Sequence, residues 1–459
     1  MTCTTPDLNQ VIDIAMGIYL AVIGLGAGGG KASSAEVSTA TYTTLYAVFA
    51  LSGFFGGSIM NTIGPKWTMT IGAFGYPFYV SGLWYYDARG QEWYPLLGGV
   101  VIGAQFAYAE EKDKGSYIAW QLFLLSLGSA IGAFVAFGIN VHDTSPNGVP
   151  SSVYLVFIII MASAMLLAFT TIVSPADVRR DDGTHLALFT APDFKAEVKG
   201  CFELLKDWRI LVLIVPMAAT EMSQSLIPTL SAYAFNLRTR SLNSVIYWLV
   251  QIPSTFLYGA ILDNTRFRRR TRGLMGLSIG LVVVMANWGL VLALQLKYNL
   301  KRDMPSPQWD WTDPVYGKFL VMILLAGISL AIDQMAVMWI LGAFSNEPRL
   351  LARYGGFFKA MLSAGLCLAF GLEAGSVSYV AQTAVQGGGM IFSFPVLFYL
   401  VFRCVSDTNY FAEEGVIPPQ NVGIGPKSAV INEPEDDGSG KTIGMGTPAV
   451  VELEEQVIM

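Results

Sequence analysis

The sequence predicts an all-α, polytopic membrane protein of about twelve transmembrane helices, built from two related halves of six helices each. Three observations predict this class. Hydrophobic residues make up 53% of the chain and charged residues only 14%, whereas soluble domains carry about 25% charged residues. Apolar stretches close to the roughly 20 residues that a bilayer crossing needs recur along the sequence. A short pattern from a glycine to a polar residue also occurs once in each half.

The apolar segments predict where the helices lie. In the first half they cover residues 11–29, 40–62, 67–86, 94–109, 116–140 and 153–174, and in the second half 208–230, 244–263, 273–296, 316–344, 354–377 and 378–403. The fourth segment is short, because about 16 residues rise only about 24 Å, less than a core of about 30 Å. This shortened helix is either a splice or gene-model variant or a strained span.

Lysine and arginine in the short loops predict the orientation. Most of them lie on the inner side if both termini are cytosolic, which an even number of spans requires. Arg238 and Arg240 are assigned to an outer loop, before the expected eighth helix. The predicted organisation is a short cytosolic N-terminus (1–10), a first half (11–174), a cytosolic middle loop (175–207), a second half (208–403) and an acidic, disordered cytosolic tail (404–459).

The remaining composition excludes several functions. The net charge of −6 comes from the acidic tail, so it gives no indication of a nucleic-acid partner. The two histidines, His142 and His185, are expected on opposite sides of the membrane and cannot share a metal. No catalytic triad and no nucleotide-binding loop is present in the sequence. We therefore expect no enzyme activity, no cofactor and no metal site in this integral membrane protein, whose particular membrane the sequence does not indicate.

A repeated pattern ends the expected second and eighth helices. Its two copies are Gly57, Asn61, Gly64 and Lys66 in the first half, and Gly259, Asp263, Arg266 and Arg268 in the second. The spacing of four places the glycine and the polar residue on one helix face. Glycine lets a neighbouring helix approach closely, and the basic residues suit lipid headgroups. This pattern resembles the loop signature of the major facilitator superfamily, in which Asn61 would replace the usual Asp.

Six polar or charged side chains fall within expected spans, where each is costly and is therefore a functional candidate. They are Glu221, Gln224, Gln251, Asp333, Gln334 and Lys359. Glu221 and Asp333 are expected to bind substrate or couple it to protons. The alternative is a structural hydrogen bond, for Asp333 one to Lys359. Gln251 is expected to bond a neighbouring helix, and Glu373 to be solvated at the outer end of its span.

Several short stretches together resemble a more specific family. They are GLGAGGG from Gly24, EKDKGSYI from Glu111, FNLRTRSLN from Phe235, YWLVQI from Tyr247, DWTD from Asp310, WILGAFSN from Trp339 and GFFK from Gly356. The combination resembles the Unc-ninety-three-like family of the major facilitator superfamily, in its fungal branch. The resemblance implies a twelve-helix transporter fold of six plus six helices, without indicating a substrate.

Two functions follow as expectations. The first is secondary transport of a small solute that the sequence does not identify, with proton coupling through buried carboxylates. Pro216, Pro228 and Pro253 are expected to interrupt the seventh and eighth helices, as ordinary kinks or as breaks that face a cavity. The alternative is a non-transporting regulator or trafficking partner of another membrane protein. In either case the lipid bilayer is a partner.

Overall fold

The computed structural model describes residues 20, 35–63, 65–103, 114–142, 150–171, 199–200, 202–264, 266–345 and 348–406. All of them belong to one compact unit, residues 1–416. The expected first helix apart from Leu20, residues 104–109 of the expected fourth helix, most of the middle loop and nearly all of the tail lie outside this description. So do the side chains of Gly57, Asn61, Gly64 and Lys66.

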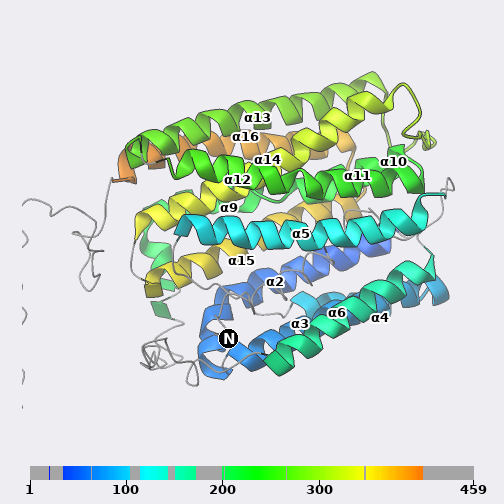
Figure 1. Cartoon of the computed structure of the whole chain (residues 1–459), viewed down its shortest axis with the longest axis horizontal. Helices are drawn as coiled ribbons and strands as arrows, with labels where there is room; N and C mark the ends of the chain where they lie inside the picture. Colours follow the sequence, from blue (N-terminus) through cyan, green and yellow to red (C-terminus); the bar gives the residue numbers. More distant parts are fainter. Residues whose placement is uncertain are drawn as a thin grey trace, which may run out of the picture. The chain divides into compact units, whose positions relative to one another are not determined.

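The described part of the first half contains five helices (Figure 1). They are α2 (Ala35–Ile63), α3 (Pro65–Arg89), α4 (Trp93–Gly103), α5 (Lys114–Asn140) and α6 (Ser151–Thr171). Each contains the apolar segment expected there or most of it. The α3 helix packs against α4 and α6, and the rings of Tyr79 and Phe157 are fully buried between these helices.

The second half is described almost completely. A helical turn, η3 (Leu204–Lys206), precedes α8 (Trp208–Val212), α9 (Ile214–Ala219), α10 (Ser223–Ala234), α11 (Leu237–Leu249), α12 (Gln251–Leu262), α13 (Arg269–Lys297), α14 (Tyr316–Phe344), α15 (Pro348–Ala374) and α16 (Tyr379–Cys404). By length and composition, five helices among the described residues are able to cross a membrane: Leu237–Leu262, Arg269–Lys297, Tyr316–Phe344, Arg353–Ala374 and Tyr379–Cys404. Within the same residues the only β structure is an isolated bridge between Phe235 and Trp309.

The two halves meet through two helix pairs. The α2 helix packs along α15, and α5 packs along α11 and α12 (Figure 1). In the expected numbering these are helices 2 with 11 and 5 with 8. In a repeat of six plus six helices, helix 2 corresponds to helix 8 and helix 5 to helix 11. The two pairs are therefore equivalent, as expected of two parallel repeats. The pocket described below is lined by the second of these pairs, through residues of α5, α11 and α12.

Short turns interrupt the expected seventh and eighth helices, although the backbone keeps right-handed helical angles at Leu213, Thr220 and Val250. The seventh is interrupted at Leu213 and again at residues 220–222, and the eighth at Val250. Pro216 and Pro253 each follow a break by three residues. Proline lacks the N–H that would continue the helix and clashes with the preceding turn, which explains both positions. The prediction is therefore confirmed for Pro216 and Pro253, but it is wrong for Pro228, which lies inside α10.

Glycines hold the broken segments against their neighbours. A Cβ on Gly365 of α15 would lie 1.9 Å from the carbonyl oxygen of Ala218, just before the break at 220–222. A Cβ on Gly327 of α14 would lie 2.6 Å from the carbonyl oxygen of Tyr247, just before the break at Val250. Only glycine permits backbones to approach this closely. Two helices of the second half, α15 and α14, therefore pack directly against the backbone next to these two interruptions.

The start of the eighth helix was predicted wrongly. Arg238 and Arg240 lie within α11, not in a preceding loop. The helix begins earlier because the side chain of Asn236 accepts a hydrogen bond from the backbone N–H of Thr239 at 3.0 Å, a typical N-terminal cap. The polar residues of its first turns are tolerated because protein surrounds them, and Arg240 is only 3% exposed.

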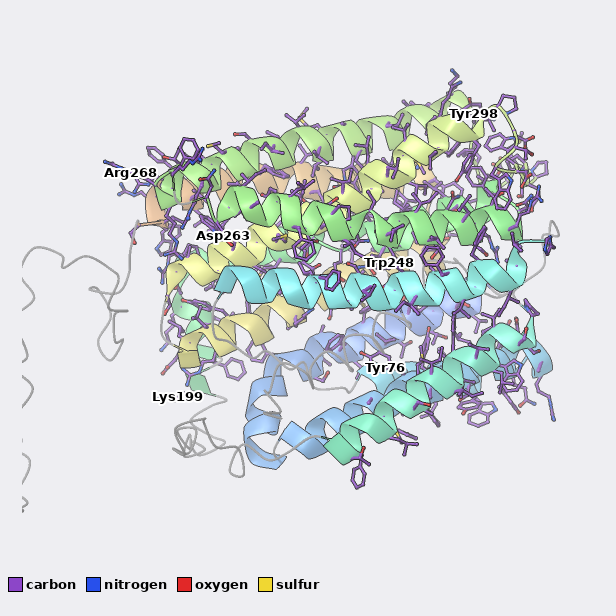
Figure 2. The ribbon with its side chains drawn as sticks, in the orientation of Figure 1. Tyr76, Lys199, Trp248, Asp263, Arg268 and Tyr298 are labelled. Carbon is purple, nitrogen blue, oxygen red and sulfur yellow. The ribbon has the colours of Figure 1, made fainter. Side chains whose placement is uncertain are left out.

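The two ends of the helices carry different groups (Figure 2). Lys199 of the middle loop lies at the same end as Asp263 and Arg268, which belong to the connection between α12 and α13. Tyr298, after α13, lies at the opposite end. The middle loop and the loop after the eighth helix therefore share one face, as the predicted topology requires. Which face is cytosolic stays a prediction.

Candidate functional site

A pocket lies between the halves, about midway along the helices. About 290 Å³ of space among its lining residues, open solvent included, is not filled by atoms. Its described lining consists of Leu20, Leu122, Leu125, Ser126, Glu221, Gln224, Trp248, Gln251, Thr255, Leu330, Ala331 and Gln334. Trp248, labelled between α5 and the ribbon of α11 and α12 in Figure 2, marks its position. Four of the six polar candidates from the sequence line this one pocket.

Glu221 occupies the break between α9 and α10. Both oxygens of its carboxylate accept a hydrogen bond from a carboxamide. Gln224 Nε2 donates to one oxygen and Gln334 Nε2 of α14 donates to the other, each at 3.0 Å. The residue is 8% exposed. Among the described residues no Lys, Arg or His lies within ion-pair distance of this carboxyl group, so its hydrogen bonds are all to neutral groups.

Two polar atoms of the pocket lining have no hydrogen-bond partner within the described structure. They are Gln224 Oε1, an acceptor, and Trp248 Nε1, a donor. The side chains are 3% and 2% exposed. Buried polar atoms are nearly always bonded, so such atoms need an explanation, and a ligand is one. Trp248 could not be identified from the sequence, because a tryptophan in a span is more often a packing residue.

Among the described residues, Gln251 bonds within the expected eighth helix and not to a neighbouring one, contrary to the expectation. Its Nε2 donates to the carbonyl oxygen of Tyr247 at 3.1 Å, across the break at Val250. The hydroxyl of Thr255 donates in turn to the carbonyl oxygen of Gln251 at 2.8 Å. These bonds stay within the broken eighth helix because the break leaves nearby carbonyls without their usual partners. Gln251 and Thr255 thus form the edge of the pocket at the break.

Asp333 and Lys359 do not line this pocket. The Asp333 carboxylate is 7% exposed and accepts a bond from Ser329 Oγ, one turn earlier in α14, at 3.2 Å. The proposed bond between Asp333 and Lys359 is absent from the described contacts. The ammonium of Lys359 on α15 acts electrostatically on Glu221 instead, from beyond ion-pair distance. The two carboxylates that the sequence grouped together therefore belong to different surroundings.

The described copy of the repeated pattern lies at the end of α12, away from the pocket. A Cβ on Gly259 would lie 3.5 Å from Cε of Met335 in α14, which is an ordinary van der Waals distance. The backbone N–H of Asp263 donates to the carbonyl oxygen of Gly259 at 2.8 Å and closes the helix. Desolvation raises the pKa of the Asp263 carboxyl, and Arg272 opposes that rise. Arg266 and Arg268 are exposed, as residues facing lipid headgroups would be.

A cluster around Asp310 joins the loop between α13 and α14 to the start of α11. The carboxylate accepts from Arg238 Nε at 2.8 Å, from Asn236 Nδ2 at 3.0 Å and from Thr239 Oγ1 at 2.9 Å. The hydrogen bond from Arg238, helped by the other donors, holds the pKa of Asp310 well below its usual range. The guanidinium of Arg238 lies over the ring of Trp311, with Cζ 4.7 Å from the ring centre.

The same loop reaches the first half. The ring of Trp311 contacts Phe137 of α5, with 5.8 Å between the ring centres. One turn further along α5, Asn140 Nδ2 donates to Ser241 Oγ of α11 at 3.2 Å. Both contacts lie at the end of the molecule that holds Tyr298, which the topology predicts to be external. They join the two halves at that end.

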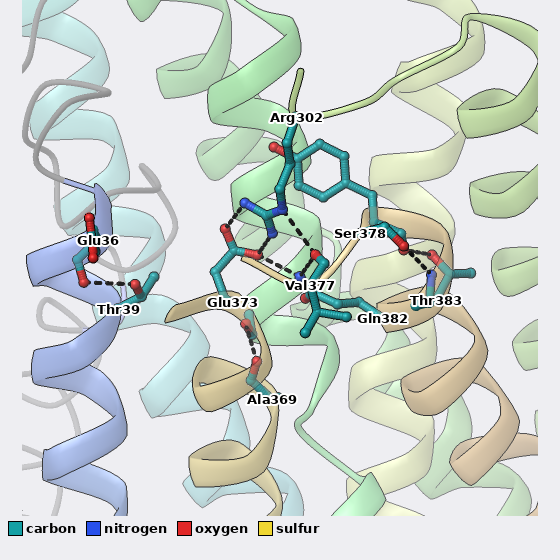
Figure 3. A network of polar contacts seen from close by, with 12 residues as sticks. Glu36, Thr39, Arg302, Ala369, Glu373, Val377, Ser378, Gln382 and Thr383 are labelled. Atoms are coloured by element: carbon teal, nitrogen blue, oxygen red, sulfur yellow. Dashed lines mark hydrogen bonds and ion pairs between the residues drawn. The ribbon is translucent and has the colours of Figure 1, made fainter. Parts of the chain in front are cut away.

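A second cluster corrects the expectation for Glu373. This residue at the end of α15 is 6% exposed rather than solvated. Figure 3 shows its carboxylate paired with the guanidinium of Arg302, which also donates to the carbonyl oxygen of Val377 at 2.9 Å. Gln382 Nε2 donates to the same carboxylate at 2.7 Å. The loop before α14 therefore folds back over α15 and α16 and covers a carboxylate that the sequence alone leaves exposed.

Comparison with known proteins agrees with this architecture. Residues 37–344 match the family model described as ion channel regulatory protein UNC-93. An uncharacterised membrane protein of Schizosaccharomyces pombe is 40% identical over 87% of this chain and 82% of its own length. An UNC93-like protein of the same yeast is 32% identical over 85% and 81%. The major facilitator superfamily proton:xylose symporter XylE superposes with a TM-score of 0.59, at 12% identity, over 86% and 94% of the two chains. That identity supports a likeness of fold alone.

Proposed function

The chain belongs to the UNC-93 family, and from that premise we propose that it is a secondary transporter of a small solute. The solute would bind in the pocket between the halves, with Glu221 as its main contact. One observation carries the proposal: a buried carboxylate lies at a helix break, in a pocket that both halves line. Secondary transporters place their substrate sites near the bilayer midplane, at the interface of repeats and at discontinuous helices.

The contacts between the halves support a rocking mechanism. The α5–α11 contacts at Asn140 and Trp311 join the halves at one end of the pocket. At the other end α2 meets α15, where the rings of Phe54 and Phe357 touch with centres 6.1 Å apart. Neither set contains an ion pair between the halves among the described residues. Such contacts can part and re-form in alternation at low cost, as alternating access requires.

Proton coupling would use Glu221. The titratable or charged groups that act on it are Lys359 of α15 and Tyr247 of α11. Its hydrogen bonds come from Gln224 of its own segment and from Gln334 of α14. Binding of a proton and of a solute donor to the same carboxylate would be mutually exclusive, which is the simplest way for one group to couple the two.

Uptake by reconstituted protein tests this proposal. Full-length protein in liposomes is assayed with a panel of labelled sugars, amines and amino acids, with and without a pH gradient. We expect Glu221→Gln to abolish the dependence on the gradient and to reduce uptake at least tenfold. Glu203→Gln, an exposed glutamate outside the pocket, is the matched control and should leave uptake unchanged. Uptake that ignores both the gradient and Glu221→Gln would refute the role of this carboxylate.

The family description favours a second candidate, a regulator of another membrane protein. In that case the fold would bind a partner instead of moving a solute. Extraction in a mild detergent followed by purification distinguishes the two. A partner recovered in stoichiometric amounts, together with no uptake of any solute in the panel, would favour regulation. Uptake by the protein alone would favour transport.

A further inference from the structure

We propose that the pocket between the halves binds a small organic ammonium ion that also carries a hydrogen-bond acceptor. As a transport substrate this ligand rests on the proposed function, but its binding can be measured separately. The inference comes from what the pocket lacks: a positive charge next to Glu221, a donor for Gln224 Oε1 and an acceptor for Trp248 Nε1.

The charge of the pocket indicates the first requirement. Glu221 is the only charged residue among the described lining residues. Both of its oxygens accept from amide N–H groups, the pattern of an ionised carboxylate, which has acceptors only. A buried charge is normally paired, and neutral amides compensate it only in part. Lys359 lies outside the pocket lining, so a cationic ligand is the partner that would complete the site.

The two unpartnered atoms indicate the second requirement. Gln224 Nε2 donates to Glu221, and Oε1 of the same amide accepts no hydrogen bond from the described residues. An ammonium group carries three N–H donors and could serve this oxygen and the carboxylate together. Trp248 Nε1 can only donate, and it has no acceptor. A ligand hydroxyl or carbonyl oxygen would satisfy it, which a simple alkylammonium could not do.

The walls of the pocket indicate an organic ligand. Four leucines, Leu20, Leu122, Leu125 and Leu330, line the pocket beside Trp248. Apolar walls with a few convergent polar groups are typical of sites for organic ligands. A sugar is the chief competitor, because three glutamines could bond its hydroxyls, but a sugar leaves the charge of Glu221 unpaired.

A matched pair of probes tests the inference. Phenylethanolamine carries an ammonium and a hydroxyl, and styrene glycol differs only by a hydroxyl in place of the ammonium. Binding of each, and of D-xylose, is measured by calorimetry on full-length protein in lipid nanodiscs. We expect phenylethanolamine to bind at least roughly tenfold more tightly than styrene glycol, because a charge-assisted bond is stronger than a neutral one.

Two variants assign the effect to named atoms. Glu221→Gln should remove the preference for the amine while leaving styrene glycol binding within about twofold, which also shows that the variant is folded. Trp248→Phe, which keeps a ring but removes the N–H, should weaken both probes. Glu203→Gln should change neither. Equal binding of the amine and the diol, a preference for D-xylose, or an amine preference that survives Glu221→Gln would each overturn the inference.

The outcomes separate this inference from the proposed transport. Phenylethanolamine that binds through Glu221 but is not taken up by liposomes would support the ligand class and refute transport of it. Uptake of another solute that depends on Glu221, with no binding of phenylethanolamine, would refute the ligand class and leave transport standing.

Discussion

Replacement of Gly365 by alanine tests how tightly α15 packs on the broken seventh helix. The new Cβ would lie 1.9 Å from the carbonyl oxygen of Ala218, whereas Cβ contacts under 3.0 Å are essentially never found. The two backbones must therefore part by about 1.1 Å at this point. Because the obstacle is backbone and not a flexible side chain, rotamer changes cannot relieve it. Overpacking of this kind costs about 1–3 kcal/mol.

The same displacement would break a nearby hydrogen bond. Ser225 Oγ of α10 donates to the carbonyl oxygen of Ala369, one turn after Gly365 in α15, at 3.1 Å. A shift of about 1.1 Å takes this pair to about 4 Å, beyond hydrogen-bonding distance. A net bond of this type contributes about 0.5–1.5 kcal/mol. We therefore expect Gly365→Ala to destabilise the protein by a few kcal/mol in total.

The assay is the apparent melting temperature of purified protein in nanodiscs. Gly289→Ala is the matched control, because a Cβ at Gly289 of α13 would meet nothing within 4 Å. Glycine costs about 1 kcal/mol relative to alanine inside a helix, so the control should melt at or slightly above the wild-type temperature. Gly365→Ala should melt several degrees below it. A Gly365→Ala protein as stable as Gly289→Ala would refute the close packing of α15 on α9.

Three further predictions follow from the ends of the helices. Asp310→Asn should lower the melting temperature by a constant amount from about pH 8 to pH 5 and by less below about pH 4. The reason is that the stability contributed by a carboxyl with a lowered pKa is lost only as the pH falls through that pKa. A difference in melting temperature that already disappears near pH 6 would contradict this. Glu373→Gln leaves Arg302 without its ion pair and should raise the rate of proteolysis in the loop at 299–315. The control Glu203→Gln should not raise it. Equal rates of proteolysis in the two variants would contradict the role of this ion pair. Single cysteines at Lys199 and Arg268 should react with an impermeant reagent from one side of the membrane and a cysteine at Tyr298 from the other, and labelling of all three from the same side would contradict the topology.

Much of the candidate site could be predicted from the sequence, because lipid makes buried polar residues conspicuous. A carboxylate or carboxamide within an apolar segment is costly whatever the neighbouring helices are, which is why Glu221, Gln224, Gln251 and Gln334 were identified singly. Their grouping could not be predicted. Glu221 and Gln334 are 113 residues apart, and no local pattern indicates that their side chains meet. Trp248 was missed for the same reason, since its unpartnered N–H is a property of its surroundings.

The errors arose where protein replaces lipid or water as the surroundings of a residue. Arg240 looked external because a charge suits a loop, yet α11 buries it against the first half. Glu373 looked solvated at the end of a span, yet Arg302 folds over it. A hydropathy pattern compares each residue with bulk lipid or bulk water and cannot represent a partner from a distant segment.

The sequence by itself determined that this chain is a membrane protein, where most of its described helices lie and which polar side chains within them need an explanation. Those properties follow from local composition, because each helix satisfies its own backbone within the bilayer. Only the tertiary structure decided which of those side chains share a pocket, where the seventh and eighth helices break and which contacts join the halves. These depend on packing between segments far apart in the chain, where a glycine such as Gly365 acts only through the backbone that it meets.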